Sequence, residues 1–300
     1  MSDRALAIGV EALPAGAPRR AGLRDVLREM PWPAIVPLLA VVVVGLLAPA
    51  LAPYSPVQGV LAEKLLPPAF MPGGNPAHPL GTDALGRDTL SRFVFGARIS
   101  LIVSLVAVAF SGAIGVAVGV VAGYYGRWVD AALMRITDVA LSLPLVLIAI
   151  VMAVAMGPSF WNVILVISFL LWPRYARQMR GETLGIRQED YIALSQVAGL
   201  SPARIIWRHI LPNVMPTFLV LATLQVGYVI LLESTLSFLG VGLPSPEPAW
   251  GVMVAEGRGL LASAWWLALF PGLGIFVTVL SVNSLGDWLR DRLDPKLRQV

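Results

Sequence analysis

The chain alternates between long stretches without a charged residue and shorter charged segments. Most of the uncharged stretches are close to the length of about 20 residues that a helix needs to cross the hydrocarbon core of a bilayer. One of them, residues 139–173, is too long for a single span, and Gly157-Pro158-Ser159 divides it in two. The pattern predicts an all-α integral membrane protein with six transmembrane helices, at about 32–52, 99–125, 139–156, 160–175, 215–240 and 265–285.

The segments between these helices predict the topology. Lys and Arg collect on the cytoplasmic side of membrane proteins, and a topology with both termini cytoplasmic puts 17 of the 22 Lys and Arg residues on that side. The expected organisation is a cytoplasmic tail (1–31), a first helix (32–52), an extracytoplasmic loop (53–98), a five-helix core (99–286) with a cytoplasmic loop at 176–213, and a cytoplasmic tail (287–300). The net charge of +4 is explained by this distribution, so we expect membrane lipid and not nucleic acid as a partner.

Composition narrows the classes of function. Hydrophobic residues make up 57% of the chain and charged residues 13%, a balance typical of membrane proteins. There is no cysteine, and the two histidines, His78 and His209, are far apart, so no disulfide, thiolate or metal cluster is expected. The only lysines, Lys64 and Lys296, do not complete a G-x-x-x-x-G-K-[ST] phosphate loop. We expect a non-catalytic chain without a cofactor, whose spans lack the charges of a proton-driven pump.

The segment between the fourth and fifth predicted helices carries two sets of helix start and stop signals. Asp190 can cap a short helix over residues 191–198, and Gly199 is a natural terminator in the left-handed conformation. Ser201-Pro202 then predicts the start of a second helix, which Pro212 is expected to end.

The first of these two short helices is expected to have an apolar face. Tyr191, Leu194 and Ala198 recur at helical spacing and fall on one side. An apolar face held in water is normally covered by a partner. The alternative is an ordinary loop between two spans.

The same segment resembles the EAA loop of the membrane-spanning subunits of ABC importers, which has a Glu-Ala-Ala triplet, then Gly, then Ile-x-Leu-Pro or a close variant. Gly199 and the ending His209-Ile210-Leu211-Pro212-Asn213 match, whereas the triplet position holds Ala193-Leu194-Ser195 and lacks the glutamate. The resemblance implies that the first helix inserts into a cleft of a separate ATP-hydrolysing subunit. The residues that it implicates in this coupling are Tyr191, Ala193, Leu194, Ser195, Ala198, Gly199, Leu200, Ile210, Leu211 and Pro212.

Two further stretches resemble the dipeptide/oligopeptide/nickel branch of these permeases. Residues 78–101 read HPLGTDALGRDTLSRFVFGARISL, and residues 284–298 read SLGDWLRDRLDPKLR. Two interpretations of the first stretch are open: a loop that braces the helices, or a direct contact with the substrate or its delivery protein. The second is interpreted as an amphipathic helix at the membrane surface.

Together the three motifs imply a type I ABC importer permease fold in a bacterial inner membrane. The implied function is translocation of di- or oligopeptides, or of a related solute such as a nickel chelate or glutathione. The implied partners are a second homologous permease, two subunits that bind ATP and Mg, and an extracytoplasmic solute-binding protein. The alternative is a secondary transporter or channel not coupled to ATP hydrolysis, for which inverted repeats would be expected.

Two features inside the predicted helices each have two interpretations. Glu233 lies in the fifth span, about two turns from its outer end, close enough to reach the interface. It either makes structural hydrogen bonds or lines the translocation path.

Ser111, Gly115, Gly119 and Gly123 form a smooth stripe on the second span, which suits close helix packing within this chain or against a second membrane subunit.

Overall fold

The computed structural model of the protein describes residues 29–293, so the predicted cytoplasmic tail up to residue 28 and residues 294–300 lie outside the described part. The described part is helical, and its one β-bridge joins Thr82 and Asp88. The elements are α2 (Trp32–Leu46), α3 (Ala48–Leu51), η1 (Leu61–Glu63), α4 (Thr89–Tyr125), α5 (Arg127–Ser142), α6 (Leu145–Met156), α7 (Phe160–Arg187), α8 (Asp190–Val197), α9 (Pro202–Ile205), η2 (Ile206–Ile210), α10 (Leu211–Phe238), α11 (Trp250–Gly257), η3 (Arg258–Leu260) and α12 (Trp266–Leu293).

Each of the six predicted transmembrane stretches is largely helical. Among the described residues, three helices are long and apolar enough to cross a membrane: Thr89–Tyr125, Pro202–Phe238 and Trp266–Leu293. The pair α5 and α6 adds a fourth if it is one broken span, since the two helices are bent by 89° at Leu143-Pro144. The remaining predicted stretches form α2, which is shorter, and the first half of α7.

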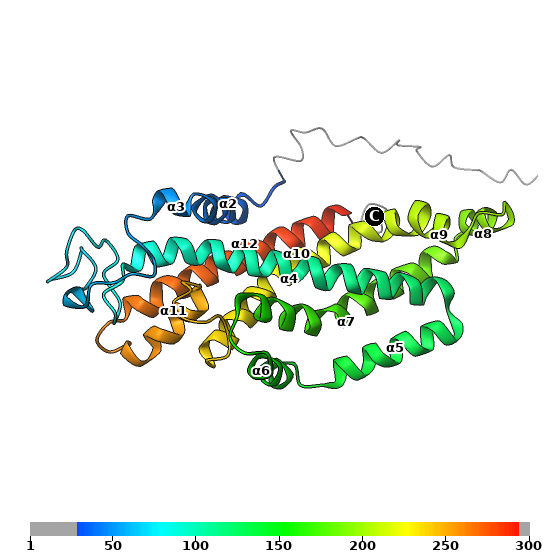
Figure 1. Ribbon diagram of the computed structural model, residues 1–300. Coiled ribbons are helices and arrows are strands. Elements are labelled where there is room, and N and C mark those ends of the chain that lie inside the picture. Colours follow the sequence, from blue (N-terminus) through cyan, green and yellow to red (C-terminus); the bar gives the residue numbers. More distant parts are fainter. Residues whose placement is uncertain (1–28, 294–300) are drawn as a thin grey trace, which may run out of the picture. The chain divides into compact units, whose positions relative to one another are not determined.

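Helix α4 packs along α7 (Figure 1). The glycines of the small-residue stripe make this contact. A Cβ added at Gly115 would lie 2.3 Å from the Cβ of Tyr175. One added at Gly119 would lie 2.5 Å from the carbonyl oxygen of Ala176. Gly123 is equally close to α7, with a Cβ 2.7 Å from that of Thr183. Of the two interpretations of the stripe, packing within the chain therefore holds for these three glycines.

Gly119→Ala is expected to weaken the packing of α4 on α7. The new methyl group meets backbone, which cannot move aside as a flexible side chain would, and such overpacking costs about 1–3 kcal/mol of folding free energy. The measurement is thermal unfolding of the purified protein in detergent. Gly181→Ala is the matched control, because a Cβ at that position of α7 meets nothing within 4 Å and alanine favours a helix by about 1 kcal/mol. Equal unfolding temperatures for the two variants would contradict the packing role.

Two segments predicted as loops are partly or largely helical, because charged residues in this chain lie inside helices. Helix α4 begins at Thr89, ten residues before the predicted start at 99, and Asp88 caps it by accepting a hydrogen bond from the Ser91 backbone N–H at 2.7 Å. Residues 126–138, predicted as a loop, form most of α5. The two carboxylates of α5 are paired with α7: the Arg180 Nη2 donates to Asp130 at 2.6 Å, and the Arg177 Nη2 donates to Asp138 at 2.6 Å.

Pro212 does not end the second short helix. The chain continues from α9 through the π-helical turn η2 into α10, and Pro212 lies in the first turn of α10. In the first turn of a helix the missing N–H of proline removes the fewest hydrogen bonds. The proline ring also fits there when the preceding turn leaves room for it. The wider π turn is where the backbone changes hydrogen-bond register, since Leu211 N–H bonds to the carbonyl of Ile206.

The carboxyl-terminal part also differs from the prediction. Helix α12 continues through Ser284 to Leu293, so the expected amphipathic helix does not begin as a separate element, and its last residues lie outside the described part. The predicted loop after α10 contains the short helix α11. This helix packs on α4, α10 and α12, and its buried Trp250 donates from Nε1 to the carbonyl of Phe93 in α4 at 2.9 Å.

Candidate functional site

Helices α8 and α9 lie at one end of α4, and the loop that precedes α4 lies at the other (Figure 1). Gly199 links α8 to α9 with a φ of +78°, a left-handed conformation that glycine adopts without strain. The N–H of Leu200 closes the turn on the carbonyl of Ser195 at 3.2 Å. The predicted terminator is thereby confirmed. The expected cap at Asp190 is not, because Glu189 occupies the N-cap position without a side-chain hydrogen bond and Asp190 is the first helical residue.

Helix α8 is anchored on one side and exposed on the other. Ile192 is fully buried, in a cluster that also contains Ile205 and Ile210. On the opposite side Leu194 is 68% exposed and Val197 is 87% exposed. The exposed residues of the predicted coupling set are Tyr191, Ala193, Leu194, Ala198, Gly199 and Pro212, while Ser195, Leu200 and Leu211 are half-buried.

Two members of this region differ from what the sequence indicates. Ile210 matches the motif but is fully buried, so it supports the segment from beneath and does not lie on the exposed face. Val197 is the most exposed apolar side chain of α8 and was not among the predicted residues. Its place one turn after Ala193 and three residues after Leu194 is the signal that identifies it, since it extends the same apolar side of the helix.

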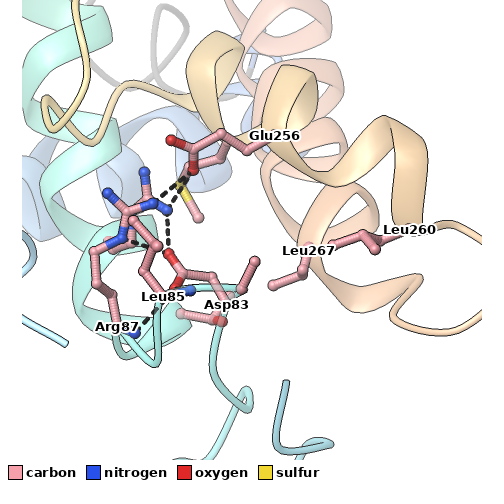
Figure 2. A pocket seen from close by; sticks show the side chains of 10 residues that line it. Asp83, Leu85, Arg87, Glu256, Leu260 and Leu267 are labelled. Atoms are coloured by element: carbon pink, nitrogen blue, oxygen red, sulfur yellow. Dashed lines mark hydrogen bonds and ion pairs between the residues drawn. The ribbon is translucent and has the colours of Figure 1, made fainter. Parts of the chain in front are cut away.

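At the other end, four charged residues form a cluster between the loop before α4, the first turn of α4 and α11 (Figure 2); Asp83, Arg87 and Arg92 are buried, and Glu256 is partly exposed at its rim. Arg87 Nε donates to Asp83 at 2.6 Å, and its Nη2 donates to Glu256 at 2.9 Å. Arg92 Nη1 donates to Glu256 at 2.6 Å and also contacts Asp83. Each arginine therefore faces both carboxylates. A cavity of about 260 Å³ adjoins the cluster, lined also by Thr89, Met253, Leu260 and Leu267.

A second set of polar contacts fixes the same loop. His78 Nδ1 lies 2.9 Å from Asp88, and His78 Nε2 lies 3.3 Å from Glu63. Gly81 and Gly86 have φ angles of +76° and +72°, as expected for tight turns. These contacts tie the loop to the start of α4, which supports a bracing role.

Glu233 is buried in α10. Its Oε1 accepts a hydrogen bond from the Ser237 hydroxyl at 2.7 Å. A Cβ added at Gly251 of α11 would lie 3.2 Å from the other carboxylate oxygen, so α11 covers this side. The contact with Ser237 favours the structural interpretation. No group of three His, Asp or Glu side chains within residues 29–293 is arranged to hold a metal ion.

The sequence is similar to bacterial peptide permeases along most of its length. A dipeptide transport system permease protein of Haemophilus influenzae is 41% identical over 87% of this chain and 89% of that protein. A di/tripeptide transport system permease of Pseudomonas aeruginosa is 39% identical over 88% and 87%. A probable D,D-dipeptide transport system permease of Escherichia coli is 40% identical over 83% and 82%.

Solved structures show the same fold at low sequence identity. The methionine ABC transporter MetNI, in an inward-facing conformation, matches with a TM-score of 0.57 and 18% identity, over 68% of this chain and 96% of that chain. An amino acid ABC transporter matches with a TM-score of 0.52 and 13% identity, over 68% and 94%. The family model described as "binding-protein-dependent transport system inner membrane component" matches residues 115–299. By this match and its relatives, the chain belongs to the family of binding-protein-dependent ABC importer permeases.

Proposed function

We propose that this chain is a permease subunit that carries di- or oligopeptides across the bacterial inner membrane, driven by ATP hydrolysis in separate subunits. The peptide class rests on the relatives, whose names specify dipeptide, di/tripeptide and D,D-dipeptide transport. Related solutes such as nickel chelates or glutathione belong to the same proposal, because the sequence of a permease alone does not select among them.

The observation that carries the coupling to ATP hydrolysis is the geometry of α8. A short helix exposes Leu194 and Val197 to solvent, while its other side is fixed to the body of the protein by Ile192. A helix held in this way can be gripped by a partner and can pass a displacement to the helices beneath it. The proposed partner is an ATP-binding subunit whose cleft receives α8.

The remaining partners follow from the same proposal. A second, similar permease completes the pathway, two ATP-binding subunits hold ATP and Mg, and an extracytoplasmic binding protein delivers the solute. The distribution of Lys and Arg supports both termini, and α8, on the cytoplasmic side. The loop before α4, with its charge cluster, then lies on the delivery side. Membrane lipid covers the outer apolar helix faces.

The test is affinity purification of the tagged chain from its native membrane in mild detergent, with mass spectrometry of the retained proteins. We expect a second permease and ATP-binding subunits, together with ATP-dependent uptake of a radiolabelled dipeptide after reconstitution. Recovery of the chain alone, with uptake that needs no ATP, would instead support a secondary transporter or channel.

A further inference from the structure

The connection between α9 and α10 has an unusual backbone. Residues 206–210 form a π-helical turn, in which the Leu211 N–H reaches back five residues to the carbonyl of Ile206. Pro212 and Pro216 follow in the first turns of α10 and contribute no N–H to the helix. The π turn therefore replaces a regular α-helical hydrogen bond with a wider one, and each of the two prolines removes one N–H donor from the helix that follows. π turns are rare, and they mark places where a helix can change register.

One side chain completes this turn and connects it to α8. The amide Nδ2 of Asn213 donates to the carbonyl oxygen of His209 at 2.6 Å. The same amide nitrogen lies 3.5 Å from the hydroxyl of Tyr191, the second residue of α8. The Tyr191 ring also lies against the His209 ring, with centroids 6.1 Å apart. Tyr191 thus touches both partners of the hydrogen bond between the Asn213 side chain and His209, a residue of the π turn.

Helix α8 and the π turn also share one buried apolar cluster. Ile192 of α8 packs in one cluster with Ile205 and Ile210, which flank and end the π turn, and with Val214 of α10. A displacement of α8 therefore acts on the π turn from two sides, through the apolar cluster beneath and through Tyr191 and Asn213 above.

We propose that the π turn is the joint through which movement of α8 reaches α10, and that Asn213 is the positioning residue that ties α8 to this joint. This inference rests on the proposed function, in which an ATP-binding subunit moves α8. Coupling between two sites requires an element with two discrete arrangements. The joint meets this requirement, because the same residues can form a π turn or an α turn.

The experiment uses the complex purified from its native membrane and follows the outer end of α10. The chain has no cysteine, so Leu239→Cys places a single, 47% exposed thiol at the end of this helix. Its rate of maleimide labelling is compared with and without ATP plus vanadate. In this background we expect nucleotide to change the labelling rate. Adding Asn213→Ala should decrease that change by about threefold or more, the factor that corresponds to one lost hydrogen bond.

Retention of the ATP-binding subunits is measured in every sample. Asn213→Ala is expected to retain them fully, which separates a broken joint from failed docking. Tyr191→Phe, which removes only one hydroxyl, should show a smaller decrease in the same direction. Asn162→Ala is the matched control, because the Asn162 amide also donates to main-chain carbonyls, at 2.7 and 3.1 Å, but in the first turn of α7.

The outcomes are distinguishable. If no ATP-binding subunit is retained by the Leu239→Cys background itself, the proposed function fails. If the subunits are retained but nucleotide does not alter labelling, movement does not reach α10 and the joint is refuted. An unchanged response in Asn213→Ala, an equal loss in Asn162→Ala, or loss of the ATP-binding subunits from Asn213→Ala would each overturn the role of Asn213.

Discussion

Leu194→Asp is expected to abolish ATP-driven uptake while leaving the amount of protein in the membrane unchanged. Leu194 is 68% exposed on α8, so a carboxylate there remains in water in the isolated chain and does not disturb the fold. In the complex, the same carboxylate would be taken into the contact with the ATP-binding subunit. An uncompensated buried charge costs several kcal/mol, and each 1.4 kcal/mol weakens binding about tenfold.

The measurement is the amount of ATP-binding subunit retained per tagged chain, together with ATP hydrolysis by the purified complex. A decrease in retention of at least about tenfold is expected. Leu61→Asp is the matched control, because Leu61 is also 68% exposed but belongs to the loop before α4. Full retention and normal substrate-stimulated hydrolysis by Leu194→Asp would refute docking through this face.

The departure from the EAA pattern bears on the same contact. The position of the missing glutamate holds Ala193, which is exposed on α8 beside Leu194. No carboxylate is therefore available at the first triplet position to pair with a cation on the partner. Docking in this protein is expected to depend on apolar burial, which makes the contact less sensitive to salt than an ion-paired one would be.

The apolar pattern was sufficient to locate the helices, because a helix that spans a bilayer must have a certain length and must lack charged residues. Both features can be recognised in a single sequence. Local signals also located α8 and its terminator, since the positive φ of Gly199 is a property of one residue and its neighbours. These features depend on residues close together in the chain.

The two loop errors share one physical cause, which is pairing between residues far apart in the sequence. Arg92 was assigned to a loop because it is charged, yet it lies in α4 and pairs with Glu256, 164 residues away. Asp130 was assigned to a loop for the same reason, and Arg180, 50 residues away, pairs with it. A sequence pattern shows that a residue is charged but not which distant residue pairs with it in the fold. A charged helix end is therefore indistinguishable from a loop in the sequence.

Pro212 shows a different limit. The rule that proline ends a helix assumes a regular α-helical turn before it, in which the ring would clash with a carbonyl. The π turn at Ile206–Ile210 removes that condition, and α10 continues to Phe238. No composition rule predicts a π turn here, because the residues around it, Ile205 and Ile210, pack in one cluster with Ile192 and Val214 from the neighbouring helices.

Asp83→Asn is expected to be strongly destabilising, because Asp83 balances two arginines that have almost no contact with water. Arg87 is 3% exposed and Arg92 is 1% exposed. In the described part of the chain, Nε and Nη2 of Arg92 are buried without a hydrogen-bond partner, so its charge depends on Asp83 and Glu256 alone. Removing one partner of a buried ion pair typically costs about 3–5 kcal/mol.

Asparagine is chosen so that the turn itself is preserved. Asp83 Oδ1 accepts hydrogen bonds from the N–H groups of Leu85 and Arg87 at 2.8 and 2.9 Å, and an amide oxygen can accept both. The readout is thermal unfolding in detergent and the protein level in the membrane. Arg177→Ala is the control, since Arg177 and Asp138 are also 2.6 Å apart but each is 59% exposed. Losing that pair should cost about 1 kcal/mol or less.

The double variant Asp83→Asn with Arg87→Met tests whether Asp83 stabilises the protein by balancing charge or by filling its place in the packing. Removing Arg87 as well leaves Arg92 paired with Glu256 and restores neutrality to the cluster. Replacing both members of a buried ion pair is often close to neutral, whereas removing one is not. The double variant is therefore expected to be more stable than Asp83→Asn alone. A double variant that is less stable than the single one would show that Arg87 holds the loop against α11 through Glu256, independently of Asp83.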